Sequence, residues 1–232
     1  MQKFLTARWQ DLIMANYEVE PSLLASRLPA GTQLDLNEGK CFVSLVGFMF
    51  LDTRVLGLPI PFHINFEEVN LRFYIKREVD GEIRRAVCFV KEIVPRFAIA
   101  TVARVVYGEP YECWHMAHSK TESTVAYNWS KNDIDNRLSI EIDKSVGVPA
   151  VGSHGEFIIE HYWGYTKRDG NRVDEYKVEH PKWELFSVKN ELIDVDFAKT
   201  YGKEFGFLSG AVPYSVLLAK GSEVAVFKGK SI

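Results

Sequence analysis

The clearest pattern in the chain is the alternation of apolar and polar side chains between residues 65 and 96. Two β-rich runs, 68–77 and 84–94, flank the dipeptide Asp80-Gly81. Asp-Gly favours a type I′ turn, which needs positive φ at both central positions and joins two antiparallel strands. The sequence therefore predicts a β-hairpin over this stretch.

The turn position also predicts which residues face each other across the hairpin. If Asp80-Gly81 is a two-residue turn, one face is apolar apart from Glu92 and is expected to pack on the core. Its predicted pairs are Ile75 with Ala86, Phe73 with Cys88, Leu71 with Val90, and Val69 with Glu92.

The opposite face of the hairpin mixes charged and apolar side chains. Its predicted pairs are Tyr74 with Val87, Arg72 with Phe89, Asn70 with Lys91, and Glu68 with Ile93. A mixed face of this kind is typical of a cavity that holds a small polar ligand. The alternative is a surface ladder of charges, in which the lysine stem covers apolar atoms and its ammonium stays in water.

Lys91 is the candidate nucleophile of this predicted pocket. Burial and a neighbouring cation such as Arg72 favour the neutral amine, whereas Glu68 favours the charged form. A neutral Lys91 could form a Schiff base with a ketone. Glu68 is the candidate proton-transfer group, and Glu92 is a second one, although the predicted pairing places it on the other face.

Several further elements follow from local patterns. Pro21 and the leucines after it predict a helix over 21–28. The runs TQLDL and CFVSLVGFMFL, separated by residues 37–40, predict a hairpin. The spacing of Ile99, Val102, Ala103 and Val106 predicts a short helix that ends at Gly108. A late helix is predicted over 197–205, with Asp196 as its N-cap.

The second half of the chain reads mostly as strands. EFIIEHYWGYTK and RVDEYKVEH flank the turn-like residues 168–171, and KWELFSV and AVPYSVLLA are two further predicted strands. Many strands with few helices predict a mainly β, β-rich α+β fold. We expect one domain over residues 1–232, built as an antiparallel β-rich barrel or sandwich with two or three short helices.

Composition narrows the class of protein. The 232 residues carry a net charge of −3 with both signs interspersed, which argues against a nucleic-acid-binding surface. Three widely spaced cysteines suggest no disulfide framework. The N-terminus has no signal-peptide pattern, and the longest nearly apolar run is too short to span a bilayer. A cytoplasmic protein without a membrane partner is expected.

Each of the other candidate side chains also has an ordinary structural role open to it. His115 and His118 form an H-x-x-H pair without further ligands, so no metal site is predicted. His161 is expected within an aromatic layer, with proton transfer as the alternative. Arg96 could bind a carboxylate through its two-pronged guanidinium, or it could be a charge at the rim of the site. No phosphate-binding loop, nucleotide motif or serine-nucleophile motif is present, and no cofactor is expected.

Several blocks of the sequence resemble a known family in the same order. The blocks ANYEVEPSLLASRLPAGTQLDLNEGKCFVSLVGFMF, LPIPFHINFEEVNLRFYI, FVKEIVPR and YGEPY resemble the uncharacterised YqjF-like family. That family is placed in the acetoacetate decarboxylase-like superfamily. The resemblance implies a β-barrel-like fold with an internal pocket.

The resemblance also implies a search for the catalytic lysine of the decarboxylases, which belongs to an adjacent lysine pair. The corresponding region here, ARVVYGEPYECWH, contains no lysine and instead offers Tyr107, Glu109 and Tyr111. An arginine near the start of the decarboxylase pattern is replaced by Glu18. No catalytic residue is therefore carried over by position.

The leading expectation is a protein that binds a small polar metabolite, a carboxylate or keto compound, in an internal pocket. The candidate catalytic residues are Lys91 and Glu68, and the candidate ligand-binding residues are Asn70, Arg72, Arg96, Tyr107 and Tyr111. One alternative is a carbon–carbon lyase that uses a lysine Schiff base. Another is a non-catalytic interaction protein whose mixed face joins two subunits of a homodimer.

Overall fold

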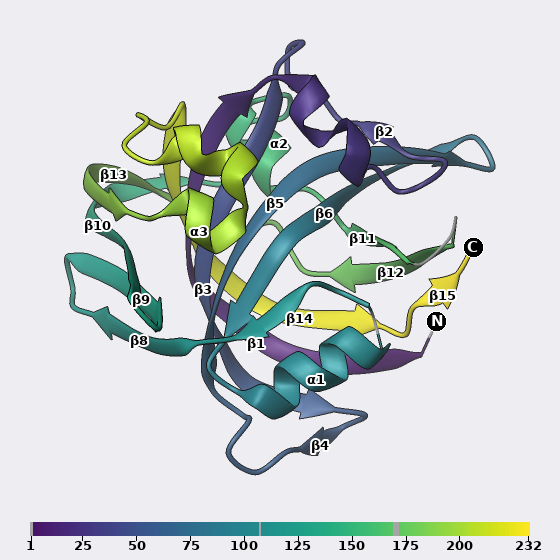
Figure 1. Ribbon diagram of the computed structural model, residues 1–232, viewed down its shortest axis with the longest axis horizontal. Helices are drawn as coiled ribbons and strands as arrows, with labels where there is room; N and C mark the ends of the chain where they lie inside the picture. Colours follow the sequence, from purple (N-terminus) through teal and green to yellow (C-terminus); the bar gives the residue numbers. More distant parts are fainter. Residues whose placement is uncertain (1, 107, 169–171) are drawn as a thin grey trace.

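The computed structural model describes residues 2–106, 108–168 and 172–232. Within these residues the strands join in one 15-stranded sheet (Figure 1). The strands are β1 (Lys3–Val19), β2 (Gln33–Leu34), β3 (Cys41–Val55), β4 (Leu58–Pro59), β5 (Phe66–Val79), β6 (Glu82–Val94), β7 (Tyr111–Cys113), β8 (His115–Lys120), β9 (Thr124–Lys131), β10 (Ile134–Gly147), β11 (Trp163–Lys167), β12 (Val173–Glu179), β13 (Leu185–Asp194), β14 (Ser215–Phe227) and β15 (Lys230–Ser231).

Short helices decorate the sheet. They are the α-helices α1 (Phe97–Val106), α2 (His154–Ile159) and α3 (Phe197–Tyr201), and the 3-10 helices η1 (Pro21–Arg27) and η2 (Lys203–Leu208). The mainly β fold class with a barrel-like sheet is confirmed.

The sheet closes on itself to form a barrel. Neighbouring strands follow the order β12-β11-β6-β5-β3-β1-β14, and β12 also pairs with β14, which completes the ring. Most pairs are antiparallel, but β6 and β11 are joined by a short parallel ladder, Trp163 to Ala86 and Gly164 to Val87. Closure leaves these seven strands with an inner and an outer face.

Both faces of the barrel wall are apolar. The outer face of β1, β3, β5 and β6 packs against β9, β10 and α3, with Tyr127, Trp129 and Phe197 among its buried side chains. The inner face contributes a second buried cluster that includes Phe48, Phe66 and the side chains of α2. Burial on both sides explains why β3 reads as a nearly continuous apolar run, CFVSLVGFMFL, rather than as an alternating one.

The predicted hairpin is present as β5 and β6. Asp80 and Gly81 have φ of 53° and 81°, so both turn residues adopt the left-handed conformation that a type I′ turn needs. The predicted partners are confirmed from Val79 and Glu82 as far as Arg72 and Phe89. Beyond that point the predicted pairing is wrong, because a β-bulge shifts it by one residue. Leu71 pairs with Lys91, and Asn70 pairs with Glu92.

Other predicted elements are present with changes. The helix over 21–28 is the 3-10 helix η1, and the late helix is divided into α3 and η2 at Gly202. Asp196 caps α3 as predicted, since its side chain accepts a hydrogen bond from the Lys199 amide. The predicted TQLDL hairpin is wrong: β2 pairs with β5, and only an isolated bridge joins Asn37 to Lys40.

The strand predicted from residue 156 is also wrong in its first half. Residues 154–159 form helix α2, and β11 begins only at Trp163. Ser153 is the N-cap of this helix, because its side chain accepts a hydrogen bond from the Glu156 amide. The cap competes successfully with the strand propensity of Phe157, Ile158 and Ile159.

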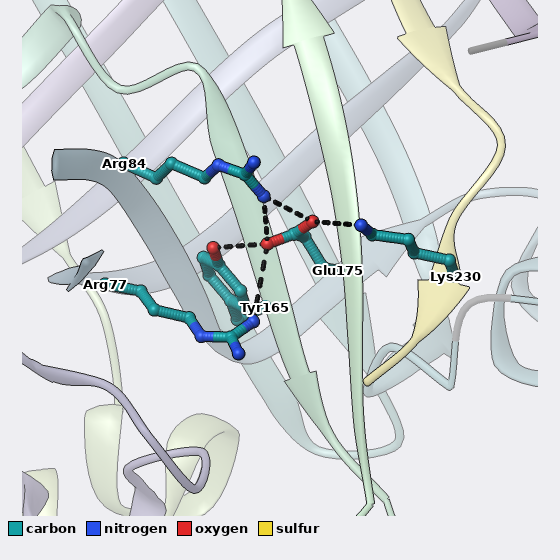
Figure 2. Close-up of polar contacts among 5 residues, drawn as sticks. All are labelled: Arg77, Arg84, Tyr165, Glu175 and Lys230. Atoms are coloured by element: carbon teal, nitrogen blue, oxygen red, sulfur yellow. Dashed lines mark hydrogen bonds and ion pairs between the residues drawn. The ribbon is translucent and has the colours of Figure 1, made fainter. Parts of the chain in front are cut away.

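A buried ion-pair cluster reinforces the barrel near its short parallel seam (Figure 2). The Glu175 carboxylate on β12 accepts two hydrogen bonds from one Arg84 nitrogen, at 2.7 and 2.8 Å, and one from the Tyr165 hydroxyl at 2.6 Å. Arg77 and Lys230 approach the same carboxylate to 3.6 and 3.5 Å. These side chains come from five strands, so the cluster links β5, β6, β11, β12 and β15.

Among the described residues, none of the helices is both long and apolar enough to cross a bilayer. Cys41, Cys88 and Cys113 are free thiols.

Candidate functional site

The interior of the barrel contains a cavity of about 230 Å³. Each of the seven ring strands contributes lining residues, and α1 and the loop around Ile60 and His63 complete the wall. Aromatic side chains form much of the surface: Trp9, Phe48, Phe50, Phe66, Phe89 and Trp183. Since a water molecule takes roughly 30 Å³, the space is large enough for a small organic molecule.

A row of polar side chains on β5 crosses this apolar lining. Glu68, Asn70 and Arg72 alternate along one face of the strand, and all three line the cavity. Glu68 and Asn70 are each 2% exposed. The Asn70 amide donates a hydrogen bond to Glu68 Oε1 at 3.0 Å, while its own oxygen is buried without a hydrogen-bond partner. The predicted grouping of these three residues in a pocket agrees with their positions in the structure.

The bulge in β6 brings a second carboxyl group to the same wall. Val90 and Lys91 together occupy the space of one residue, so Glu92 is turned to the cavity face beside Asn70. Glu92 is 2% exposed, and its Oε2 has no hydrogen-bond partner. The prediction that Glu92 lies on the opposite face is therefore wrong.

The segment before β7 supplies a third carboxyl group and a tyrosine. Tyr111 pairs with Glu92 in the parallel β6–β7 ladder, and its hydroxyl donates to Glu68 Oε2 at 2.9 Å. Glu109 is buried two residues earlier and also lines the cavity, near Tyr176 of β12. Three buried glutamates therefore share one end of the cavity.

Burial and mutual repulsion make these carboxyl groups weak acids. Burial raises the pKa of Glu68 to about 7, although Asn70, Tyr111 and Arg72 all favour its charged form. Burial also raises the pKa of Glu109 to about 7. The pKa of Glu92 is raised well above its ordinary value by burial and then by the charges of Glu109 and Glu68. Near neutral pH the cluster therefore holds both protonated and ionised carboxyl groups.

Arg72 supplies a positive charge to this cavity. Its guanidinium donates to the Ile158 carbonyl at 3.3 Å, contacts Met14 Sδ at 3.8 Å and lies 5.6 Å from the centre of the Tyr74 ring. Its Nε is buried and has no hydrogen-bond partner. Arg72 therefore retains donor capacity for a further acceptor inside the cavity.

A neutral histidine lies beyond Arg72. His161 Nε2 is 3.4 Å from Asp35 Oδ2, and its ring packs against Tyr74 and Phe157. Burial lowers the pKa of His161 to about 4 despite the nearby Asp35. The expected place of His161 in an aromatic layer agrees with these contacts, and its ring also lines the cavity.

Two of the predicted site residues are not in the cavity wall. Lys91 points to the other side of the sheet, where its ammonium lies 2.8 Å from Glu112. The reason is the same bulge, which reverses the side on which Lys91 was expected. Arg96 is exposed just before α1 and does not line the cavity. Tyr107 lies outside the described residues.

Glu109 and Tyr176 are site residues missing from the predicted set, and Glu92 was predicted only as a second proton-transfer group on the other face of the hairpin. The only sequence signal for Glu109 is its two-residue spacing from Tyr111, which places both on one face of an extended segment. The position of Glu92 in the cavity cannot be predicted without knowledge of the bulge in β6. Tyr176 lines the cavity because the closure of the barrel places β12 in its wall. The H-x-x-H pair lies elsewhere: His115 and His118 are exposed on β8, and His118 contacts Glu67.

Gly164 leaves the space that the Tyr176 ring occupies. A methyl group added at Gly164 would overlap the ring and hydroxyl of Tyr176, its cross-strand partner. We expect Gly164→Ala to displace Tyr176 from Glu109 and to destabilise the fold by about 1–3 kcal/mol, as overpacking generally does. Thermal unfolding measures the loss of stability, and the affinity for any compound that binds in the cavity should fall as Tyr176 is displaced.

Gly206→Ala is a suitable control for this substitution, because its added methyl group would lie near Ala198 and away from the cavity. It should leave affinity unchanged. Unchanged affinity in Gly164→Ala would contradict a role of Tyr176 in the site.

Comparison with known sequences identifies relatives of most of the chain. Residues 6–223 match the DUF2071 family, which is described as an uncharacterized conserved protein. The "Uncharacterized protein YqjF" of Bacillus subtilis (strain 168) is 35% identical over 189 residues. That match covers 79% of this chain and 76% of the relative.

Comparison with solved structures identifies the fold. Acetoacetate decarboxylase from Legionella pneumophila superposes with a TM-score of 0.72 at 14% identity, covering all of this chain and 88% of that one. The enduracididine biosynthesis enzyme MppR, in complex with pyruvate, gives 0.67 at 14% identity, covering all of this chain and 91% of MppR. An acetoacetate decarboxylase-like enzyme from Sphingomonas wittichii gives 0.67 at 11% identity, with coverage of 100% and 94%.

Proposed function

This chain belongs to the DUF2071 family and has the acetoacetate decarboxylase-like fold, and on that premise we propose that its barrel cavity binds a small metabolite with a carboxylate or keto group. One observation carries the proposal. The partly unsatisfied guanidinium of Arg72 lines the same aromatic cavity as Asn70 and Glu92, and each of these two residues has a buried oxygen without a partner. Buried polar groups are normally satisfied, so these atoms need a further partner.

The chemistry of the wall favours a short oxo acid. A carboxylate accepts hydrogen bonds from a guanidinium, and a keto oxygen accepts one from a protonated carboxyl group such as that of Glu92. Two proteins with this fold point to the same class, since one is named for acetoacetate and MppR is seen with pyruvate. The aromatic remainder of the wall suits an apolar substituent.

The residues that line the cavity do not favour the alternative function, a carbon–carbon lyase that uses a lysine Schiff base. Among the described residues that line the cavity, none is a lysine, and Lys91 is engaged with Glu112 on the other side of the sheet. The residues outside the described part are Met1, Tyr107 and 169–171, and none of them is a lysine. A Schiff base would lack its amine in this cavity.

Binding of a panel of oxo acids tests the proposal. Pyruvate, 2-oxobutyrate and acetoacetate would be titrated by calorimetry into the wild-type protein and into Arg72→Gln. A hydrogen bond to a charged group contributes roughly 1.5–3 kcal/mol, so the loss of Arg72 should weaken binding at least about tenfold. Arg72→Lys keeps the positive charge but lacks the planar guanidinium that can donate two hydrogen bonds to one carboxylate. Its affinity should lie between those of the wild type and Arg72→Gln.

Lys91→Met is the matched control, because it removes a cation on the opposite side of the sheet and should leave affinity unchanged. Thermal unfolding would establish that each variant is folded. Absence of binding by every acid of the panel, or equal affinity in wild type and Arg72→Gln, would contradict the proposal.

A further inference from the structure

The glutamates of the cavity differ in how their oxygens are held. Both oxygens of Glu68 accept hydrogen bonds, one from Asn70 and one from Tyr111. Donors of this kind favour the ionised carboxylate. Glu92, its diagonal neighbour across the β5–β6 ladder, also interacts with Tyr111, but its Oε2 has no partner and it lies among other carboxyl groups. The environment of Glu92 therefore favours the neutral acid.

A neighbouring base and acid in one largely apolar cavity form the arrangement needed for proton transfer. We propose that Glu68 and Glu92 catalyse enolisation of a small oxo acid, with Glu68 as the base, Glu92 as the acid and Arg72 holding the substrate carboxylate. This inference rests on the proposed function, because it assumes that the cavity binds such a compound.

The reaction needs only the substrate and these two side chains. The Glu68 carboxylate takes a proton from the carbon next to the carbonyl group. The electrons of that C–H bond form a C=C bond, and the electrons of the C=O bond move to oxygen, which takes the proton of Glu92. The product is the enol, with Glu68 neutral and Glu92 ionised, and the reverse steps restore the oxo acid without any oxidant or reductant.

The arrangement of side chains along β5 fits this division of roles. Glu68, Asn70 and Arg72 follow one another on the cavity face at two-residue intervals, which corresponds to about 6–7 Å per step. Long side chains can therefore reach the two ends of a short acid from the same strand. None of the described residues that line the cavity is a lysine, so no iminium group can form there. The electrons released from the C–H bond are instead stabilised by protonation of the carbonyl oxygen.

A second feature supports the role of Glu92. Near neutral pH a lone carboxyl group on the surface would be ionised and could not donate a proton. Burial together with the charges of Glu109 and Glu68 raises the pKa of Glu92, which keeps a proton available. Glu109 is thus a positioning residue that acts through Glu92.

Hydrogen–deuterium exchange tests the inference directly. Pyruvate, 2-oxobutyrate and acetoacetate would be incubated with the full chain in D₂O, and loss of the proton signal at the carbon next to the carbonyl group would be followed by NMR. At least one acid that binds should exchange faster than in buffer alone. General acid–base groups contribute roughly 10²–10⁴-fold, so Glu68→Gln and Glu92→Gln should each lower the enzyme-dependent exchange at least about 100-fold.

Both variants should keep substrate affinity within about threefold, because Arg72 is intact and glutamine is nearly isosteric with glutamate. Glu112→Gln, on the other side of the sheet, is the matched control and should leave exchange at the wild-type rate. Binding without exchange above buffer, or wild-type exchange in both glutamine variants, would overturn the inference while leaving the proposed function intact. If no acid of the panel binds, the proposed function falls and this inference falls with it.

Discussion

Glu175→Gln is expected to lower the free energy of unfolding by about 3 kcal/mol, because it removes the buried carboxylate that Arg77, Arg84 and Lys230 share. The Glu175 side chain has no exposed surface, whereas Arg77 and Arg84 are 27% and 18% exposed. Arg77 and Arg84 also face each other across the β5–β6 hairpin. Two like charges directly opposite each other destabilise a sheet, and Glu175 offsets this repulsion in the wild-type chain.

The position of the cluster increases the effect. The parallel ladder between β6 and β11 contains only two paired positions. The contacts of Glu175 with Arg84 on β6 and Tyr165 on β11 therefore add to a weak backbone connection between these two strands (Figure 2). Chemical denaturation at neutral pH measures the loss, and the melting temperature should fall by roughly 6–12 °C for a chain of this size. Because the carboxylate is buried, the loss should persist at high salt.

Glu179→Gln provides the control on the same strand. Glu179 contacts Lys177 at 2.7 Å, but its side chain is 48% exposed. An exposed pair contributes at most about 1 kcal/mol and is screened by salt. If Glu175→Gln changed stability no more than Glu179→Gln does, the cluster would not hold the barrel closed.

Local sequence patterns predicted the parts of the fold that depend on neighbouring residues. The Asp80-Gly81 turn fixed the start of the β5–β6 pairing, since both residues must adopt positive φ. The Asp196 cap of α3 is equally local. Strand β1 was not predicted: it is 17 residues long, and its alternation is interrupted at Asp11, where φ is 56° and the pairing with β3 shifts.

Closure of the barrel depends on contacts between distant parts of the chain. The β12–β14 and β6–β11 pairs join segments tens of residues apart, and only a few positions in each pair are involved. Such short ladders leave no periodic signal of their own in the sequence. The resemblance to a known family supplied this part of the fold, whereas the hydrophobic pattern indicated only many strands.

The sequence pattern predicted the site residues on β5, which is a regular strand, but not those on β6, which contains the bulge. Glu68, Asn70 and Arg72 lie on one regular strand, so simple alternation placed them together. On β6 the bulge exchanges the expected positions of Lys91 and Glu92. A single extra residue therefore changes the chemistry of the wall from a lysine to a carboxylic acid, and nothing in the residue types around Val90 marks it.

Glu109→Gln is expected to stabilise the fold at alkaline pH and to have little effect near pH 4.5. Burial raises the folded-state pKa of Glu109 to about 7, above its ordinary value of 4.5. Between these two values the folded chain keeps a proton that the unfolded chain has released, so the free energy of unfolding falls as pH rises. The loss is complete above pH 7 and amounts to about 3 kcal/mol for a shift of this size. Glutamine avoids the loss because it never ionises.

The difference between Glu109→Gln and wild type reports this carboxyl group together with the repulsion between it and its neighbours Glu92 and Glu68. Burial lowers the pKa values of His154, His161 and His180, which makes stability rise with pH over an overlapping range. These histidines are present in both chains, so their direct contribution is common to both. Denaturation curves at pH 4.5 and pH 8 would give the two free-energy differences.

Glu112→Gln should show the opposite dependence. Although burial opposes it, hydrogen bonds from Lys91, Trp114 and Lys131 lower the pKa of Glu112 to about 2. Its contribution to stability is therefore present above pH 4.5 and is lost as pH falls towards 2, so removing it destabilises the chain at pH 8. If Glu109→Gln destabilised the chain at pH 8 as Glu112→Gln does, Glu109 would be an ionised structural partner. The cavity would then lack the proton-holding carboxyl cluster on which its proposed chemistry depends.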